Sequence, residues 1–364
     1  MAKRVGVDKW LFGTVLLLVL FGLVMVFSAS AVIAKATMGS PYAFVTKQAV
    51  FALFGLVALF VLMRVDYRKY NNPKLIFPVM GITAILLIVV FLTGGKTNGA
   101  HRWIHIGGTG LQPSELAKPV VVLFLAWFLQ TRIHLIDNVK ETILPAVLPP
   151  LVYILLILKE PDLGTAMVCG AVLIMMLYLA GLQVKWIALA FLAASPVMYY
   201  LLFHVGFRAA RMRAFMDPEA DPRGAGFHIM QSLIAVSTGG IQGRGLMEGV
   251  QKLFFLPEPH TDFIFANICE ELGLIGALCV VAAFCILGYR GLRAAFLSTD
   301  PFARFLAFGL TTALLVQAFF NMSVVLALVP TKGIPLPFIS SGGTSVFITL
   351  ASMGVLLNVT REID

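Results

Sequence analysis

The sequence predicts an all-α, polytopic integral membrane protein, because it is too apolar for a soluble domain and its apolar stretches are long and continuous. Of its 364 residues, 59% are hydrophobic and 12% are charged, whereas soluble domains carry about 25% charged residues. One soluble core could not cover this much apolar surface. Inside a bilayer only helices and closed barrels satisfy every backbone polar group, and barrel strands alternate apolar and polar residues. The chain is therefore predicted to be a bundle of transmembrane helices.

Ten stretches of the chain are each close to the roughly 20 residues that a helix needs to cross the hydrocarbon core. The first is longer than the apolar region of a typical signal peptide and more spans follow, so we expect it to remain attached. Residues 1–364 are expected to form a single transmembrane domain. The predicted spans are residues 10–30, 45–63, 74–93, 114–130, 143–159, 163–180, 184–203, 263–289, 303–327 and 341–358.

Basic residues are concentrated in alternate loops, which predicts the orientation of the bundle. One set of loops is rich in Lys and Arg, as at 64–74 and 290–304, and the other set is poorer. Because cytoplasmic loops carry the excess of positive charge, both termini are expected to be cytoplasmic, in agreement with an even number of spans. The net charge of +9 is explained by this distribution, and we expect no nucleic-acid partner.

The longest connection, from about 204 to 262, falls on the outer side. A loop of this length without structure of its own would be unusual. It contains an apolar stretch, residues 228–236, that is too short to span and is predicted to be a re-entrant or interfacial helix. A glycine-rich run at 239–245 follows, where the backbone could approach a ligand or another helix closely. We expect a partly helical, membrane-associated outer loop.

Three titratable residues, Glu258, His260 and Asp262, directly precede the long apolar span that begins at about residue 263. Asp262 could cap this helix, because Asp is a preferred N-cap residue and suits the positive helix end. It could equally be a catalytic base, which works best with a pKa near ambient pH, and partial burial would raise the pKa of the carboxyl in that direction. The spacing leaves both interpretations open.

Two ionisable residues, Glu115 and Lys118, lie within a predicted span and are three positions apart, so they share one helical face. Charged groups inside a membrane usually face the bundle interior. They could form an ion pair that orders a cavity, or they could mark a proton or ion path. We favour the ion pair, because Pro113 and Ser114 begin the helix near the outer interface.

Glu160 and Asp162 lie in a very short outer loop between two apolar spans. Asp162 could cap the helix that follows. The two carboxylates could instead help to bind a divalent cation, Mg²⁺ or Mn²⁺, since both ions prefer oxygen ligands.

Basic residues on the outer side are candidate phosphate ligands. Arg208, Arg211 and Arg213 open the outer loop, and arginine suits either a phosphate or an anionic membrane surface. Lys332 is the only charged residue of a proline- and glycine-rich segment at 330–345. It could hold a substrate phosphate or extend to the lipid headgroups.

Five segments together resemble the SEDS family (shape, elongation, division and sporulation) of bacterial membrane proteins, typified by RodA and FtsW, over nearly the whole chain. Members of this family have ten transmembrane helices and a long outer loop. They polymerise lipid II into β-1,4 glycan strands at the outer face of the cytoplasmic (inner) membrane, for cell division or cell shape. The segments are residues 99–104 (GAHRWI), 111–118 (LQPSELAK), 160–165 (EPDLGT), 257–265 (PEPHTDFIF) and 330–345 (PTKGIPLPFISSGGTS).

The resemblance implies that Asp262 is the catalytic base of a glycosyltransferase. Asp262 would take the proton of the acceptor sugar's 4-hydroxyl, whose oxygen attacks the donor's anomeric carbon and expels undecaprenyl pyrophosphate with inversion. Cations would stabilise the pyrophosphate, and Arg213, Arg244, Lys332 or a divalent metal could serve. The remaining residues expected to bind substrate are Arg102, Glu258, His260 and Ser340.

Two details of the resemblance concern the branch of the family with its partner proteins and one departure from the family's sequence pattern. Residues 331–333 and the pair Asn98-Gly99 are more similar to the division-type branch than to the elongation-type branch. Such members work with a class B penicillin-binding protein, a transpeptidase with one span. This protein, other divisome or elongasome membrane proteins and the substrate lipid II are therefore the expected partners. The chain departs from the family at Ser341, where a Tyr is usual.

A different class of function, a lipid II flippase or other transporter, has also been proposed for this family. A transporter should keep its ionisable residues along a path through the membrane, with broken helices at the midplane. Here the acidic residues gather at the outer face, and Glu115 with Lys118 is the pair that enters a span. The distribution of charge favours an enzyme.

Overall fold

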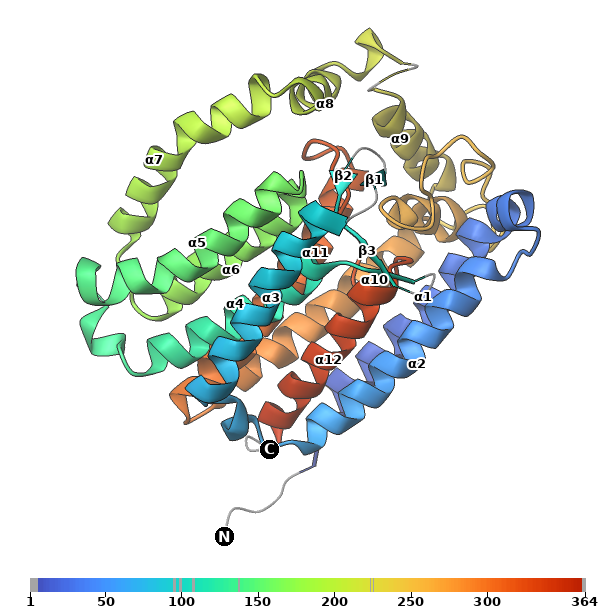
Figure 1. Ribbon diagram of the computed structural model, residues 1–364. Coiled ribbons are helices and arrows are strands. Elements are labelled where there is room, and N and C mark those ends of the chain that lie inside the picture. Colours follow the sequence, from blue (N-terminus) through green and yellow to red (C-terminus); the bar gives the residue numbers. More distant parts are fainter. Residues whose placement is uncertain are drawn as a thin grey trace.

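The computed structural model describes residues 6–93, 96–97, 100–106, 109–136, 138–222, 224 and 226–361. Asn98 and Gly99, cited above for the division-type branch, lie outside the described residues. The described residues form a helical bundle with two small hairpins at one end (Figure 1). The predicted all-α, polytopic membrane architecture is confirmed.

The first half of the bundle contains seven α-helices, together with the hairpin strands. They are α1 (Lys9–Met38), α2 (Ala43–Arg64), the 3₁₀ turn η1 (Tyr67–Tyr70), α3 (Pro73–Thr93), β1 (Lys96–Thr97), β2 (Ala100–His101), β3 (Ile104–Ile106), β4 (Thr109–Leu111), α4 (Pro113–Gln130), η2 (Ile133–Leu135), the π-helical turn η3 (Val139–Ile143), α5 (Leu144–Lys159), α6 (Leu163–Leu179) and α7 (Val184–Phe203).

The outer loop and the C-terminal helices complete the described structure. They are α8 (Gly206–Met216), η4 (Pro218–Ala220), α9 (Phe227–Gly239), α10 (Ile264–Leu297), α11 (Pro301–Val325) and α12 (Gly343–Thr360). The short helix predicted inside the outer loop is therefore present as α9, and α8 adds a second one. Strands β1 and β2 pair antiparallel, as do β3 and β4.

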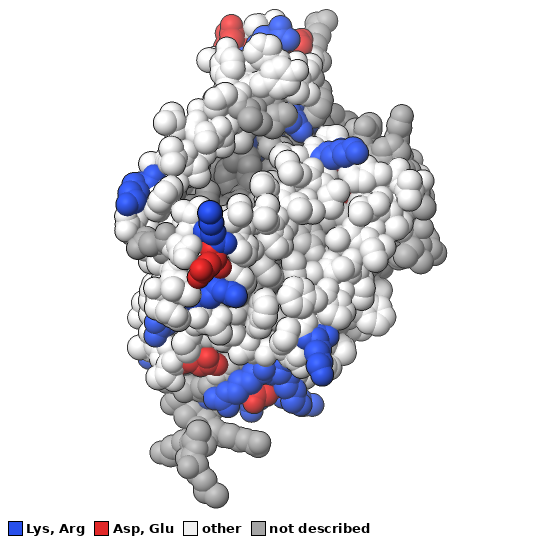
Figure 2. Space-filling model, turned by 60° about the vertical axis from the view of Figure 1, so that its left-hand side comes forward, with Lys and Arg blue, Asp and Glu red and all other residues white. Residues whose placement is uncertain are grey.

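Seven helices of the described residues are long and apolar enough to cross a membrane: α1, α2, α3, α5 with its preceding turn, α10, α11 and α12. Helices α6 and α7 are apolar over a shorter length. Helix α4 begins with polar residues, among them Glu115 and Lys118. The face in Figure 2 is mostly white, and Lys and Arg gather at the end of the molecule that holds both chain termini in Figure 1.

Helix α11 lies at the centre of the bundle, where it packs against α4, α6, α10 and α12. By contrast, α7 lies apart from the other membrane helices in Figure 1 and packs mainly against α8. No described residue of α7 is buried. The described side chains of α7 are therefore available to contact lipid.

Helix α10 is broken near its N-terminal end, at Gly273, which has φ 65° and ψ −163°. The break frees backbone groups that would have no partner in lipid. The outer loop supplies the partners: N–H groups at 244–245 donate to the carbonyls at 270–271, and N–H groups at 274–275 donate to the carbonyls at 240–241, over 2.9–3.3 Å. The glycine-rich run thus docks into the break, which fixes the start of the segment that leads to residue 262.

Two consecutive buried acids of α10 hold the same loop through their side chains. The Glu270 carboxylate accepts backbone N–H bonds from residues 250 and 251, at 2.8 and 3.2 Å. The Glu271 carboxylate accepts the Lys252 ammonium and the Ser28 hydroxyl, both at 2.7 Å, and the N–H of residue 247. Because Ser28 belongs to α1, this cluster joins two membrane helices and the loop.

Candidate functional site

A large open cavity of about 1770 Å³ lies at the end of the bundle opposite the chain termini. Its walls come from α2, the hairpin region, the segment before α10 and the proline- and glycine-rich segment before α12. The polar and small residues that line it include Arg102, Gln112, Glu258, His260, Asp262 and Gly333. Residues from all five segments of the family resemblance therefore lie in or beside one cavity.

Asp262 faces this cavity and does not cap the helix that follows it. The N-cap of α10 is Phe263, and no side chain caps it. Among the described residues, none donates a hydrogen bond to the Asp262 carboxylate. Burial, and then the nearby charge of Glu258, raise the pKa of Asp262 to about 7, against the opposing effect of Arg102. The carboxyl therefore has the pKa that a general base needs at neutral pH.

Gly333 allows a second chain segment to approach this carboxylate. A Cβ atom placed on Gly333 would lie 2.7 Å from Asp262 Oδ2, closer than real Cβ contacts occur. A side chain at residue 333 would displace the Asp262 carboxylate, so the glycine permits this close contact between the residue 262 loop and the segment before α12.

Glu258 and His260 lie on the same loop as Asp262. His260 is buried, packs on the ring of Phe44 with a centroid distance of 4.3 Å, and has its Nε2 4.0 Å from the Glu258 carboxylate. Burial lowers the pKa of His260, although Glu258 opposes this. A neutral imidazole at neutral pH is suited to hydrogen bonding with a sugar rather than to binding a phosphate.

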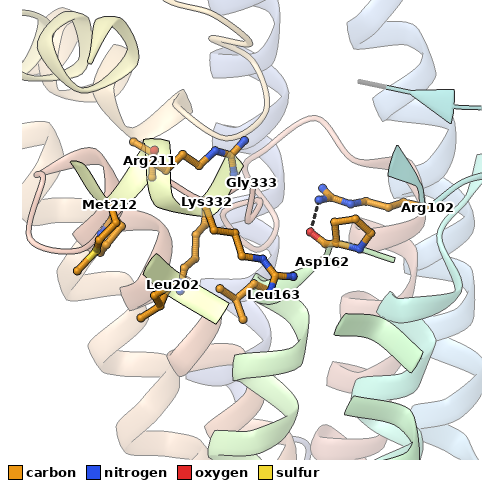
Figure 3. Close-up of a pocket in the computed structure, with 13 residues that line it drawn as sticks. Arg102, Asp162, Leu163, Leu202, Arg211, Met212, Lys332 and Gly333 are labelled. Carbon is orange, nitrogen blue, oxygen red and sulfur yellow. Dashed lines mark hydrogen bonds between the residues drawn. The ribbon is translucent and has the colours of Figure 1, made fainter. Parts of the chain in front are cut away.

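A second, smaller cavity of about 480 Å³ adjoins the first and is strongly cationic. Its lining includes Arg102, Arg208, Arg211 and Lys332 with one acid, Asp162. Figure 3 shows Arg102, Arg211 and Lys332 arranged around the space, with Gly333 at its edge. Arg102 and Gly333 line both cavities, so the cationic cavity and the large cavity meet beside Asp262.

Two cations of the small cavity, Arg102 and Lys332, form no salt bridge with a carboxylate of the described residues. Arg102 donates to the backbone carbonyls of Glu160 and Pro161, at 3.2 and 2.5 Å, rather than to a carboxylate. Lys332 forms no salt bridge with any described carboxylate, and burial, followed by the charge of Arg208, lowers its pKa to about 8. A cavity lined mostly by cations is suited to an anionic ligand.

Three residues that we expected to bind substrate lie elsewhere. Arg213 is exposed and donates to the backbone of its own helix, at Ala209. Arg244 lies beside Glu270 in the docked glycine-rich run, with its Nη1 3.9 Å from Oε1 of that acid. Ser340 is buried, and its hydroxyl bonds to backbone groups. None of the three is among the residues that line either cavity.

Arg208 and Arg211, rather than Arg213 and Arg244, line the cationic cavity. A signal for this exists in the sequence, because residues three apart share a helical face. Arg208 and Arg211 fulfil that spacing on α8, whereas Arg213 is two and five positions from them. The outer loop had to be recognised as helical at 206–216 before this spacing could be used.

Glu115 and Lys118 form a buried ion pair of 2.8 Å at the N-terminal end of α4. Lys118 also donates to Gln317 of α11 at 2.5 Å, and Gln317 donates to the Pro335 carbonyl at 2.9 Å. Through Gln317, the pair therefore supports the segment that carries Lys332 and Gly333.

Glu160 and Asp162 do not have the donor set of a metal site. The described residues contain no group of three or more His, Cys, Asp or Glu that could hold a metal ion. Asp162 caps α6 through the N–H and hydroxyl of Thr165, and it also accepts from Gln112 and Ser114. Burial, followed by the charge of Asp162, raises the pKa of Glu160 to about 8, so its carboxyl is mostly neutral at pH 7.

Comparison with known proteins identifies relatives along the whole length of the chain. The family model of cell cycle proteins that groups FtsW, RodA and SpoVE matches residues 8–364. The chain is 43% identical over 344 residues to the probable peptidoglycan glycosyltransferase FtsW of Geobacter metallireducens, which covers 94% of this chain and 91% of that protein. It is 37% identical over 359 residues to stage V sporulation protein E of Bacillus subtilis, covering 99% and 98%.

Solved structures agree with the sequence comparison. A chain of a peptidoglycan synthase complex that coordinates polymerization and crosslinking superimposes with a TM-score of 0.80 at 27% identity, over 98% of both chains. The rod shape determining protein RodA of Thermus thermophilus superimposes with a TM-score of 0.72 at 26% identity, also over 98% of both. The chain therefore belongs to the SEDS family of FtsW, RodA and SpoVE proteins.

Proposed function

We propose that this protein is a peptidoglycan glycosyltransferase that polymerises lipid II, with Asp262 as its base. The observation that carries the proposal is the position of Asp262, where a large open cavity meets a smaller cationic one. The large cavity has room for the growing glycan, and the cationic cavity suits a pyrophosphate. A base between an acceptor sugar and a donor pyrophosphate is the arrangement that glycosyl transfer requires.

The reaction follows from these positions. The acceptor's 4-hydroxyl lies against the Asp262 carboxylate and gives it a proton as the oxygen bonds to the donor's anomeric carbon. The bond from that carbon to the pyrophosphate oxygen breaks on the opposite side, so the configuration inverts. No general acid is needed, because pyrophosphate is already a good leaving group.

The cationic cavity stabilises the departing pyrophosphate. Arg102, Arg208, Arg211 and Lys332 contribute the positive charge, and preorganised charges aimed at developing negative charge are a large source of catalysis. With its pKa lowered to about 8, Lys332 is protonated at pH 7 and becomes more firmly protonated when the anion arrives. The donor set of Glu160 and Asp162 does not fit a divalent cation, so no step is assigned to one.

The lipid chain of the donor lies along the membrane-facing side of α7. The cationic cavity is bounded by Leu202 at the end of α7 and by Met212 of α8. Since α7 is exposed along its length, a polyprenyl chain that leaves this cavity can continue directly into lipid.

The proposed topology has ten transmembrane helices, with α4, α6 and α7 added to the seven long ones. The loops rich in Lys and Arg face the cytoplasm, as do both termini, and both cavities open on the outer face of the bacterial inner membrane. A class B penicillin-binding protein is the proposed partner, in keeping with the synthase complex that the chain resembles.

The test is polymerisation of lipid II by purified protein in detergent, with its transpeptidase partner. We expect glycan strands from the wild type and a loss of at least a hundredfold in rate for Asp262→Asn. The matched control is Asp217→Asn, which changes an exposed aspartate of the same outer loop. Wild-type rates from a folded Asp262→Asn variant would rule out Asp262 as the base.

The same preparation in vesicles tests the transporter alternative. A transporter uses the free ends of a broken helix to bind its substrate, whereas the free groups at Gly273 are already bonded to the outer loop. We therefore expect polymer and no transfer of lipid II across the bilayer. Transfer without polymer would support the flippase instead.

A further inference from the structure

The loop that carries Asp262 is held by its backbone rather than by its side chains. Four successive carbonyls, at residues 259–262, each accept a hydrogen bond from a different donor. In chain order the donors are the Asn267 amide at 2.7 Å, the Ser341 N–H at 2.8 Å, the Ser340 hydroxyl at 2.6 Å and the Asn321 amide at 2.8 Å. The carboxylate of residue 262 stays free while its main chain is fixed.

Asn321 of α11 differs from the other three donors because it holds a second segment as well. Its Nδ2 donates to the carbonyl of Asp262 at 2.8 Å and to the carbonyl of Ile334 at 2.7 Å. The side chain is 1% exposed. The orientation of the amide is fixed by chemistry, since the opposite orientation would set its oxygen against two carbonyl oxygens. Both donors are therefore used, and Oδ1 has no hydrogen-bond partner among the described residues.

The two carbonyls belong to the two segments that meet at the reacting carboxylate. Ile334 directly follows Gly333, and a Cβ on Gly333 would lie 2.7 Å from Asp262 Oδ2. The Asn321 amide thus ties the Asp262 backbone to the residue that directly follows Gly333, whereas Ser340 and Ser341 bond to the loop from farther along the same segment. The same segment carries Lys332 into the cationic cavity.

We infer that Asn321 is a positioning residue for glycosyl transfer, which fixes the Asp262 loop against the Gly333 segment through one bridging amide. The inference rests on the proposed function. It predicts that loss of the amide impairs the chemical step while substrate binding persists, because a misplaced catalytic group costs rate far more than affinity.

The experiment compares Asn321→Ala and Asn321→Leu with wild type in lipid II polymerisation. Leu keeps the branched shape and suits an apolar span, so it carries the test if the Ala variant does not fold. We expect kcat to fall on the order of tenfold or more, with KM changed by less than about twofold. A loosened loop would hydrate the Asp262 carboxylate, so the acidic limb of the pH profile should move to lower pH.

Asn358 provides a matched control. It is also a buried asparagine, and its side chain joins the Tyr67 N–H to the Met63 carbonyl, at the end of the bundle that holds the chain termini. Asn358→Leu should lower thermal stability as much as Asn321→Leu and leave kcat and the pH profile unchanged.

The outcomes separate this inference from the proposed function. Wild-type kcat and pH profile in a folded Asn321→Leu variant, with Asp262→Asn inactive, would overturn the positioning role alone. Equal losses of kcat in Asn321→Leu and Asn358→Leu would also overturn it, because the effect would then follow stability. Activity in Asp262→Asn would overturn the proposed function first.

Discussion

Two aspartates that precede membrane helices have opposite environments. Asp162 accepts hydrogen bonds from Thr165, Gln112 and Ser114 and caps α6. Asp262 caps nothing, and its carboxylate faces a cavity. The sequence context of each is similar, an aspartate that follows a proline within three positions and stands just before an apolar span. Residue type and position alone therefore could not separate structural support from chemistry.

The pKa of Asp262 predicts how the reaction depends on pH. A base acts in its deprotonated form, so the rate should rise as pH increases through the raised pKa of about 7. Since Glu258 raises that pKa, Glu258→Gln should move the midpoint to lower pH. Initial rates of polymerisation between about pH 5.5 and 8.5 measure both effects. A flat profile would show that proton transfer to this carboxyl does not limit the rate.

Gly333→Ala tests the close approach of the two segments. The added methyl would lie 2.7 Å from Asp262 Oδ2, so the carboxylate must move and the rate of polymerisation should fall on the order of tenfold or more. Gly342→Ala is the matched control, because Gly342 lines the same cavity and a Cβ there meets its nearest neighbour at an ordinary 3.5 Å. Equal rates for the two variants would contradict this account.

At the scale of elements, the membrane helices and the short helix α9 of the outer loop were predictable, and the docking of that loop was not. Hydropathy located the apolar stretches, since burial in lipid depends on composition over about 20 residues. The break at Gly273 left no signal of this kind, because its stability comes from loop residues about 30 positions away. The same limit explains why the position of Arg244 was not foreseen, because Arg244 lies beside Glu270 only when the loop docks into that break.

The cluster around Glu271 should be a main source of the outer loop's stability. Removing one partner of a buried ion pair typically costs about 3 kcal/mol or more, so Glu271→Gln should lower the thermal unfolding midpoint in detergent by several degrees. The exposed Glu248 of the same loop provides the control, and Glu248→Gln should have little effect. Adding Lys252→Met to Glu271→Gln should recover part of the loss. An unchanged midpoint would mean that the backbone bonds alone hold the loop.

At the scale of the whole molecule, one end carries the two cavities and the opposite end carries both termini. At that end, Asp8 joins three helices. Its carboxylate pairs with Arg290 of α10, and its backbone N–H approaches the hydroxyl of Thr360 at the end of α12. Loop charge was enough to predict an orientation, because it depends on counts of Lys and Arg. The convergence of five separated segments on two cavities depends on tertiary packing, which spacing along the chain does not reveal.

Cysteine labelling tests the proposed orientation. In a variant with the four native cysteines replaced by alanine, Asp217→Cys in the outer loop should react with a membrane-impermeant maleimide in intact spheroplasts. Lys69→Cys, in the turn η1 between α2 and α3, should react only after the membrane is permeabilised. The reverse pattern would invert the topology and move both cavities to the cytoplasmic side.

The broken helix α10 also constrains how the protein is made. A helix with unpaired carbonyls at 270–271 could not leave the translocon for lipid without penalty. The N–H groups at 244–245 bond to those carbonyls, and the carbonyls at 240–241 bond to the N–H groups at 274–275. These loop residues are synthesised earlier and, in the proposed topology, would already have crossed the membrane when α10 follows. The hydrogen-bonding partners are therefore synthesised before the broken helix, and the free groups of α10 can form their hydrogen bonds as soon as that helix enters the bilayer.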